Sequence, residues 1–147
     1  MKSLFDTETL LEIRKRLNAL TENSEKHWGK MTVGQMLHHC QGPLNIMLEK
    51  KDYGIRSNFL ATLFFKKMLY NDSPFKKSLP TARFLKETEP RNFTNERTKL
   101  IALLDEFESK RTQEEWNAHP GFGYFTKQQW GQMQYKHLDH HLKQFGE

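Results

Sequence analysis

Apolar residues recur at spacings of three and four along most of the chain, the periodicity of amphipathic helices. The first such stretch covers residues 7–20, with Asp6 or Thr7 as its N-cap. Its apolar positions are Leu10, Leu11, Ile13, Leu17 and Leu20. A second helix is expected to begin at Thr32 and to bend at Pro43, because proline lacks the N–H that a helix interior requires. Further helices are expected at residues 58–70, 94–110 and 126–145.

The start of the last helix carries the clearest local signal. Thr126 and Gln129 form a T-x-x-Q capping box, and Phe125 and Trp130 occupy the positions of a hydrophobic staple. Residues 71–90 are polar, contain three prolines and are expected to be mostly loop.

No stretch alternates between apolar and polar residues with a period of two, so strands are not expected. The 147 residues suit one domain that spans residues 1–147. The simplest architecture that agrees with these elements is an all-α bundle with long connections between the second and fourth helices.

Charge and composition exclude several classes of function. The net charge is +5, but the basic residues are scattered as separate pairs, which argues against a nucleic-acid partner. The most apolar run, residues 59–65, is far shorter than the ~18 residues of a membrane span, so no membrane partner is expected. Acidic residues stand where a signal peptide would be apolar, which indicates a cytoplasmic protein. A single cysteine, Cys40, excludes an intrachain disulfide and is expected to be buried.

Seven histidines are many for this length, and three of them crowd the last predicted helix. His137 and His141 are four residues apart, so one helical turn places both imidazoles on one face, as sharing a metal ion requires. The H-E-x-x-H protease motif is excluded, because Leu138 stands where the catalytic glutamate would be.

Helical angles select the third candidate ligand. At about 100° per residue, His39 lies near the edge of the apolar arc of the second helix, whereas His38 points further away. His39, His137 and His141 can therefore converge at the rim of the core, with one ligand position left open as in catalytic zinc sites. The alternatives are a polar helix face for the pair and a hydrogen-bonded core histidine for His39.

Three segments carry a resemblance to a known family. They are residues 31–39 after Trp28, the loop His-Pro-Gly-Phe-Gly at 119–123, and the ending His-Leu-Asp-His-His-Leu-Lys-Gln-Phe-Gly at 137–146. With them the chain resembles the DinB/YfiT-like superfamily of bacterial metal-binding helical bundles, and within it a subgroup of unknown function.

The resemblance implies a four-helix bundle with an extra helix and one divalent ion, zinc or nickel. The implied ligands are His39, His137 and His141, with His38 as the substitute for His39. Asp139 or Gln134 would support them from outside the ligand set.

The chemistry that the resemblance implies is transfer of a low-molecular-weight thiol to a small electrophile, and a homodimer is compatible with it. A metal-dependent hydrolase is one alternative. The other is a non-catalytic binding or stress-associated bundle with a vestigial or structural histidine cluster.

Overall fold

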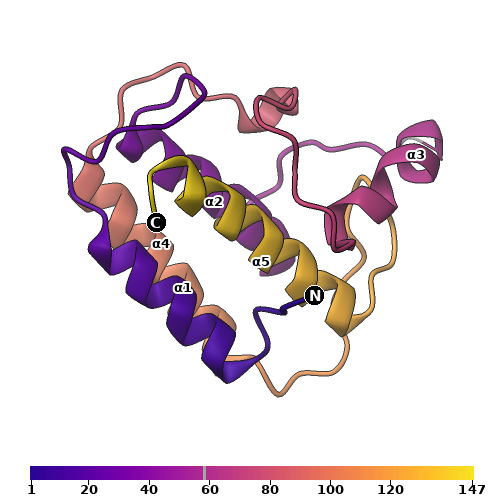
Figure 1. Cartoon of the computed structure of the whole chain (residues 1–147). Coiled ribbons are helices and arrows are strands. Elements are labelled where there is room, and N and C mark those ends of the chain that lie inside the picture. Colours follow the sequence, from indigo (N-terminus) through magenta and orange to yellow (C-terminus); the bar gives the residue numbers. More distant parts are fainter. Residues whose placement is uncertain (58) are drawn as a thin grey trace.

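The computed structural model describes residues 1–57 and 59–147 and consists of helices joined by loops (Figure 1). The elements are α1 (Thr7–Ala19), α2 (Val33–Met47), α3 (Phe59–Tyr70), the 3-10 turn η1 (Arg83–Leu85), α4 (Phe93–Ser109) and α5 (Lys127–Gln144). In the described ranges the only β-type pairing is an isolated bridge between His119 and Gly123. The all-α prediction is therefore confirmed. Asn58, the expected start of the third helix, lies outside the described residues.

Four helices, α1, α2, α4 and α5, enclose one apolar core. α2 packs against both α4 and α5, and α1 packs against α5. Arg14 joins α1 to α4 through Asp105 (2.7 Å) and Glu108 (2.9 Å). The largest fully buried side chains include Leu10, Ile13, Met36, Leu37, Leu44, Leu100, Phe107 and Trp130. This arrangement places α2 and α5, the two helices that carry the candidate ligands, in direct contact.

One apolar position was assigned to the wrong face. Leu11 is 59% exposed, although the sequence analysis grouped it with Leu10 and Ile13. At about 100° per residue Leu11 lies off the arc that Leu10, Ile13 and Leu17 share, so the core cannot reach it. α2 continues through Pro43 to Met47, and the bend expected at Pro43 stays a prediction.

α3 lies at the edge of the molecule, away from α1 and α4 (Figure 1). Lys136 of α5 holds its C-terminal end by donating to the backbone carbonyls of Met68 (2.5 Å) and Asn71 (3.2 Å). A cation at this end also interacts favourably with the helix dipole. No helix of the described residues has both the length and the apolar character that crossing a membrane requires.

Capping boxes fix the first turns of the two ligand-bearing helices. Thr126 Oγ1 accepts the N–H of Gln129 (3.2 Å), and Gln129 Oε1 accepts the N–H of Thr126 (3.0 Å). Thr32 and Gln35 make the same pair of bonds at the start of α2. Phe125 and Trp130 pack with ring centroids 5.2 Å apart, as the staple predicts.

Removing the cap of α5 should destabilise the fold measurably. We expect Thr126→Ala to lower the free energy of unfolding by about 1 kcal/mol, because the N–H of Gln129 loses its acceptor. Urea unfolding followed by circular dichroism measures the change. Thr98→Ala, in the exposed middle of α4, is the matched control and should stay within about 0.5 kcal/mol of the wild type. An equal loss in both variants would contradict the capping role.

Candidate metal centre

The structure brings together the three histidines that the sequence analysis selected. His39 comes from α2, and His137 and His141 come from α5. One ring nitrogen of each lies within 4.8 Å of the others, and Nε2 of His39 is 3.0 Å from Nε2 of His137. Residues 98 positions apart in the sequence thus form one compact nitrogen cluster.

Two of the rings are held in a defined tautomer by outer contacts. Nδ1 of His39 lies 2.8 Å from the carbonyl oxygen of Leu85, which only accepts, so this Nδ1 carries the proton. Nδ1 of His141 lies 3.0 Å from Oε1 of Gln144. The amide orientation of Gln144 is fixed because its Nε2 donates to the carbonyl of Trp28 (2.6 Å). In the neutral rings of His39 and His141, Nε2 is therefore a free lone pair, the form that binds a metal.

The third ring, His137, faces the cluster through its Nε2. Nδ1 of His137 is inaccessible to solvent and has no hydrogen-bond partner, and its Nε2 faces the lone pair on His39. Two ligands of a tetrahedral zinc ion, each about 2.0–2.1 Å from it, lie about 3.3 Å apart, close to the observed 3.0 Å. The three imidazoles are therefore close enough together that they could hold one divalent ion.

Burial keeps the three rings neutral. Loss of solvation lowers the pKa of His141 to about 3 and that of His137 well below its ordinary value. Loss of solvation also lowers the pKa of His39, although the bond to Leu85 opposes this change. The neighbouring rings add mutual repulsion between their charged forms. Neutral imidazole is the species that a metal ion requires, so no proton has to be displaced at neutral pH.

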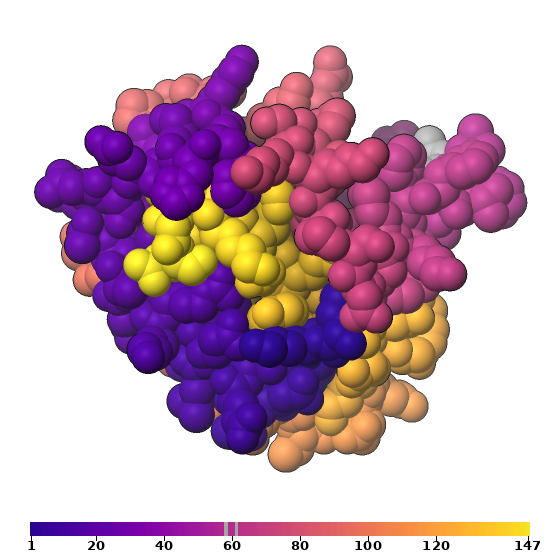
Figure 2. Space-filling model, viewed as in Figure 1, coloured from indigo at the N-terminus to yellow at the C-terminus, as the bar shows by residue number. Residues whose placement is uncertain are grey.

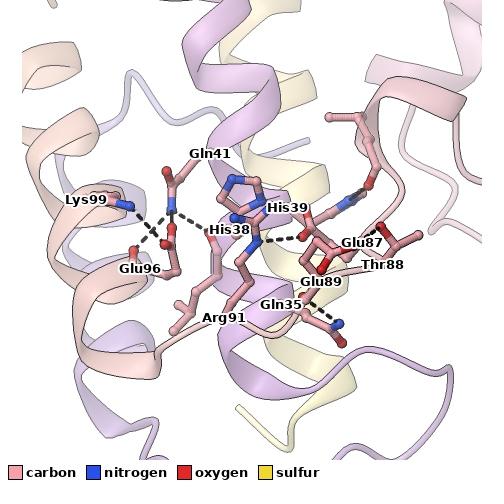
Figure 3. A network of polar contacts seen from close by, with 12 residues as sticks. Gln35, His38, His39, Gln41, Glu87, Thr88, Glu89, Arg91, Glu96 and Lys99 are labelled. Carbon is pink, nitrogen blue, oxygen red and sulfur yellow. Dashed lines mark hydrogen bonds and ion pairs between the residues drawn. The ribbon is translucent and has the colours of Figure 1, made fainter.

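The carbonyl of Leu85 belongs to residues 85–91, which lie along the outer face of α2 and are called the strap below (Figure 3). Glu87 fastens the strap, because one of its oxygens contacts Nδ1 of His38 (2.5 Å) and the other accepts from Nε of Arg91 (3.1 Å). His38 therefore faces the strap and not the cluster, as its helical angle predicts.

Two glycines of α2 allow the strap to approach closely. A methyl group at Gly34 would lie 2.3 Å from the carbonyl oxygen of Arg91, and one at Gly42 would lie 2.2 Å from the side chain of Leu85. Glycine is needed at position 34, where the close atoms are backbone, whereas at position 42 the Leu85 side chain could move aside. The contact between α2 and the strap brings the Leu85 carbonyl to His39.

A polar network on the other side of α2 joins it to α4 (Figure 3). Gln41 donates from Nε2 to a carboxylate oxygen of the buried Glu96 (2.7 Å), and Lys99 pairs with the second oxygen (2.9 Å). α2 is thus held by polar contacts on two faces, which limits the freedom of His39 between them.

Aromatic side chains surround the cluster where His140 lies. The ring of His140 is 5.0 Å from that of His141, 5.8 Å from Trp28 and 5.7 Å from Phe75. Lys77 lies 4.6 Å from the Trp28 ring centre, as in a cation–π contact. His140 therefore borders the cluster without belonging to it.

A cleft of about 370 Å³ lies between α2 and α4, and one of about 230 Å³ lies near Tyr53, but the three histidines line neither.

Two supporting roles were assigned to the wrong residues. Asp139 pairs with Arg16 (2.9 Å) and Lys143 (2.8 Å), and Gln134 donates to the carbonyl of Pro43 (2.9 Å). The outer contacts come from Leu85 and Gln144 instead. Gln144 follows His141 by three residues and could have been found by helical spacing. No sequence signal indicates a loop carbonyl such as that of Leu85.

Cys40 has no part in the cluster. Its side chain is 2% exposed, and its Sγ lies 3.6 Å from the sulfur of Met36. Burial raises the pKa of the thiol, so it behaves as a small apolar residue, as the sequence analysis expected.

His119 holds the loop that contains it. Its Nδ1 accepts the backbone N–H groups of Gly121 (3.0 Å) and Phe122 (3.2 Å), and its ring packs against Trp130. Loss of solvation lowers the pKa of His119 to about 4. This histidine therefore stabilises the turn 119–123 in its neutral form and contributes no ligand to the cluster.

Fold and site together define an all-α protein with a buried cluster of three neutral histidines. Comparison with models of known protein families assigns the chain to one of them. The chain belongs to the family described as Protein of unknown function (DUF1569), whose model matches residues 2–147. No curated protein and no solved structure matches the chain. The family description names no activity, so the site itself is the evidence for a function.

The contact between α2 and the strap can be tested at Gly34. Alanine in place of glycine within a helix ordinarily stabilises by about 0.5–1 kcal/mol. We expect Gly34→Ala to destabilise by about 1–3 kcal/mol instead, because the new methyl group meets the backbone of Arg91. Urea unfolding measures the change. Gly42→Ala should cost less, because its methyl group meets the flexible end of the Leu85 side chain. A stabilised Gly34→Ala variant would show that the strap does not lie on α2.

The neutral state of His119 predicts a pH dependence. Its pKa is lower in the folded chain (about 4) than in the unfolded one (about 6.5), so the folded state binds fewer protons. Its contribution to stability is full above about pH 6.5 and is lost as the pH falls toward 4, to a total on the order of 2–3 kcal/mol.

His119→Asn keeps an acceptor near the position of Nδ1 but does not titrate. The difference in unfolding free energy between wild type and variant should therefore shrink or change sign as the pH falls from 6.5 to 4. His27→Asn, at an exposed histidine, is the control and should follow the wild type. Parallel curves for wild type and His119→Asn would refute the assignment.

Proposed function

We propose that the chain is a divalent-metal-dependent enzyme of the DinB-like superfamily, with thiol S-transferase-like activity. The carrying observation is that ring nitrogens of His39, His137 and His141 lie within 4.8 Å of one another. Leu85 and Gln144 orient two of these rings with their lone pairs free. Imidazole nitrogen suits zinc and nickel, and we propose one of these as the ion.

The helix order supports placement in the DinB-like superfamily. That resemblance implies one ligand from the second helix and an H-x-x-x-H pair from the last one, and the cluster has this composition. In a four-helix bundle of this type α3 is the extra helix, and the chain on either side of α3 forms a long connection between α2 and α4. We propose the four-helix bundle of DinB type on this basis.

The residues around the cluster would each have a task in catalysis. A divalent ion held here would lower the pKa of a thiol or a water bound in the remaining position. Leu85 and Gln144 keep the ligand rings from rotating. Trp28 and Phe75 form an apolar border that limits the access of water from their side.

In the transfer itself, the thiol sulfur forms a bond to an electrophilic carbon of the second substrate. The leaving group departs with the bonding electrons, and the thiol proton passes to water. The net charge of +5 suits an anionic thiol. A water in place of the thiol would give a hydrolase, and the residues of the site favour neither nucleophile over the other.

One observation favours a non-catalytic role. His39 and His141 are only 4% and 8% exposed, and neither of the two clefts described above reaches them. A binding or stress-associated bundle with a structural or vestigial cluster would have this appearance. Its stability would not respond to chelators, and it would contain no metal.

Metal content separates the two proposals. We expect about one equivalent of zinc or nickel in untagged wild-type protein by elemental mass spectrometry, and its loss in His137→Ala, which removes one of three ligands. His140→Ala is the matched control, because His140 borders the cluster without joining it, and this variant should keep the metal. Loaded protein is then assayed for transfer of low-molecular-weight thiols and for hydrolysis.

Two results would contradict the proposal. Full metal affinity in a variant with alanine at positions 39, 137 and 141 would show that the site is elsewhere. A wild-type protein without metal, even after incubation with zinc or nickel, would favour the non-catalytic bundle.

A further inference from the structure

α3 presents an unusual amount of apolar surface to solvent. Eight large apolar side chains are exposed among the described residues, and five of them lie on this one helix. They are Phe59 (79%), Leu60 (62%), Leu63 (62%), Phe64 (69%) and Phe65 (52%). Contiguous apolar surface of this kind marks an interaction site more often than scattered single residues do.

Four of the five exposed apolar side chains, all but Phe65, share one side of α3. Thr62 and Lys66 lie outside this side and attach α3 to the loop before α5, donating to the backbone carbonyls of Gly121 (3.3 Å) and Tyr124 (2.5 Å). At about 100° per residue, four of the five apolar side chains and Lys67 fall within an arc of about 140°. Figure 2 shows the magenta α3 region projecting from the side of the molecule.

The net positive charge of the chain is concentrated in the sequence segment that contains this helix. Residues 55–86 contain seven lysines and arginines against one acidic residue, Asp72, which pairs with the N-terminal amine (2.9 Å). The other 115 residues contain 16 basic and 17 acidic residues. The net positive charge therefore arises from the segment that carries α3.

We propose that α3 is a peripheral membrane anchor whose apolar face enters the headgroup region of an anionic lipid surface. Aromatic and aliphatic side chains on a helix flanked by basic residues are the features of helices that lie in such an interface. Lys67 lies within the exposed arc, and its long side chain can extend to a phosphate while its stem stays among apolar groups.

Charge also favours lipid over a second copy of the chain. A two-fold dimer through α3 would oppose two segments of the same strong positive charge, which is unfavourable. The sequence predicts no membrane partner, because its apolar runs are too short to span a bilayer, but a helix that lies on the membrane surface does not have to span it. This inference does not depend on the metal centre.

Vesicle flotation with the full-length chain tests the proposal. We expect binding to vesicles of phosphatidylcholine with phosphatidylserine, weaker binding at high salt, and none to phosphatidylcholine alone. A variant with Phe59→Ser, Leu63→Ser and Phe64→Ser should bind at least about tenfold less, because its apolar contacts are lost. Leu11→Ser, at an apolar residue of α1 with 59% exposure, is the control and should bind as the wild type does. Circular dichroism establishes that both variants are folded.

A fluorescent reporter tests whether α3 itself enters the interface. Leu63→Cys can be labelled selectively with an environment-sensitive dye, because the native Cys40 is buried. The emission should shift to the blue on anionic vesicles, whereas the same dye at Leu11→Cys on α1 should not respond.

Three outcomes would overturn the proposal. One is no binding of the wild type to anionic vesicles at low salt. Another is binding without a shift at position 63, which would mean attraction by charge alone. The third is a wild-type dimer in sedimentation that the triple variant makes monomeric, without vesicle binding, which would make a second copy the occupant of this face.

Discussion

Three imidazole rings share one buried space, and the rest of the site depends on keeping them neutral and oriented. A buried ring nitrogen without a partner carries a free-energy cost, so each N–H needs an acceptor. The carbonyl of Leu85 and the amide of Gln144 provide acceptors for His39 and His141. Nδ1 of His137 is the one nitrogen of the three rings that is buried without a hydrogen-bond partner, whereas its Nε2 faces His39. Contacts from outside the cluster thus set the orientation of two of its three rings.

Those contacts come from irregular chain as well as from helices. Gln144 belongs to α5, but Leu85 ends a single 3-10 turn in a long connection. This connection is held in a fixed position on α2. Glu87 pairs with His38 of α2, and two glycines of α2 leave room for the connection to approach closely. Position along the sequence therefore says little about which residues shape the ligand geometry.

Helical periodicity was sufficient to predict four core helices and the three clustered histidines. The angular offset of His39 and the four-residue spacing of His137 and His141 are local properties, so the sequence contains them directly. The Leu85 contact was not predictable, because it depends on where a loop with little regular structure lies. The exposure of α3 was also missed, since a helix with apolar residues on most sides is expected to be buried. Leu11 is a smaller example, because it is exposed although its apolar neighbours Leu10 and Ile13 in the same helical turn are buried.

The bond between His39 and Leu85 has a thermodynamic consequence, because order in the strap and occupancy of the cluster are linked quantities. An ion bound at His39 would favour the conformations in which Nδ1 meets the Leu85 carbonyl, and it would therefore favour the attached strap. By reciprocity, attachment of residues 85–91 would raise the affinity of the cluster for that ion by the same factor. Residues 71–84 connect α3 to the strap, so a change in the position of α3 can be transmitted along the chain to the residue that contacts His39.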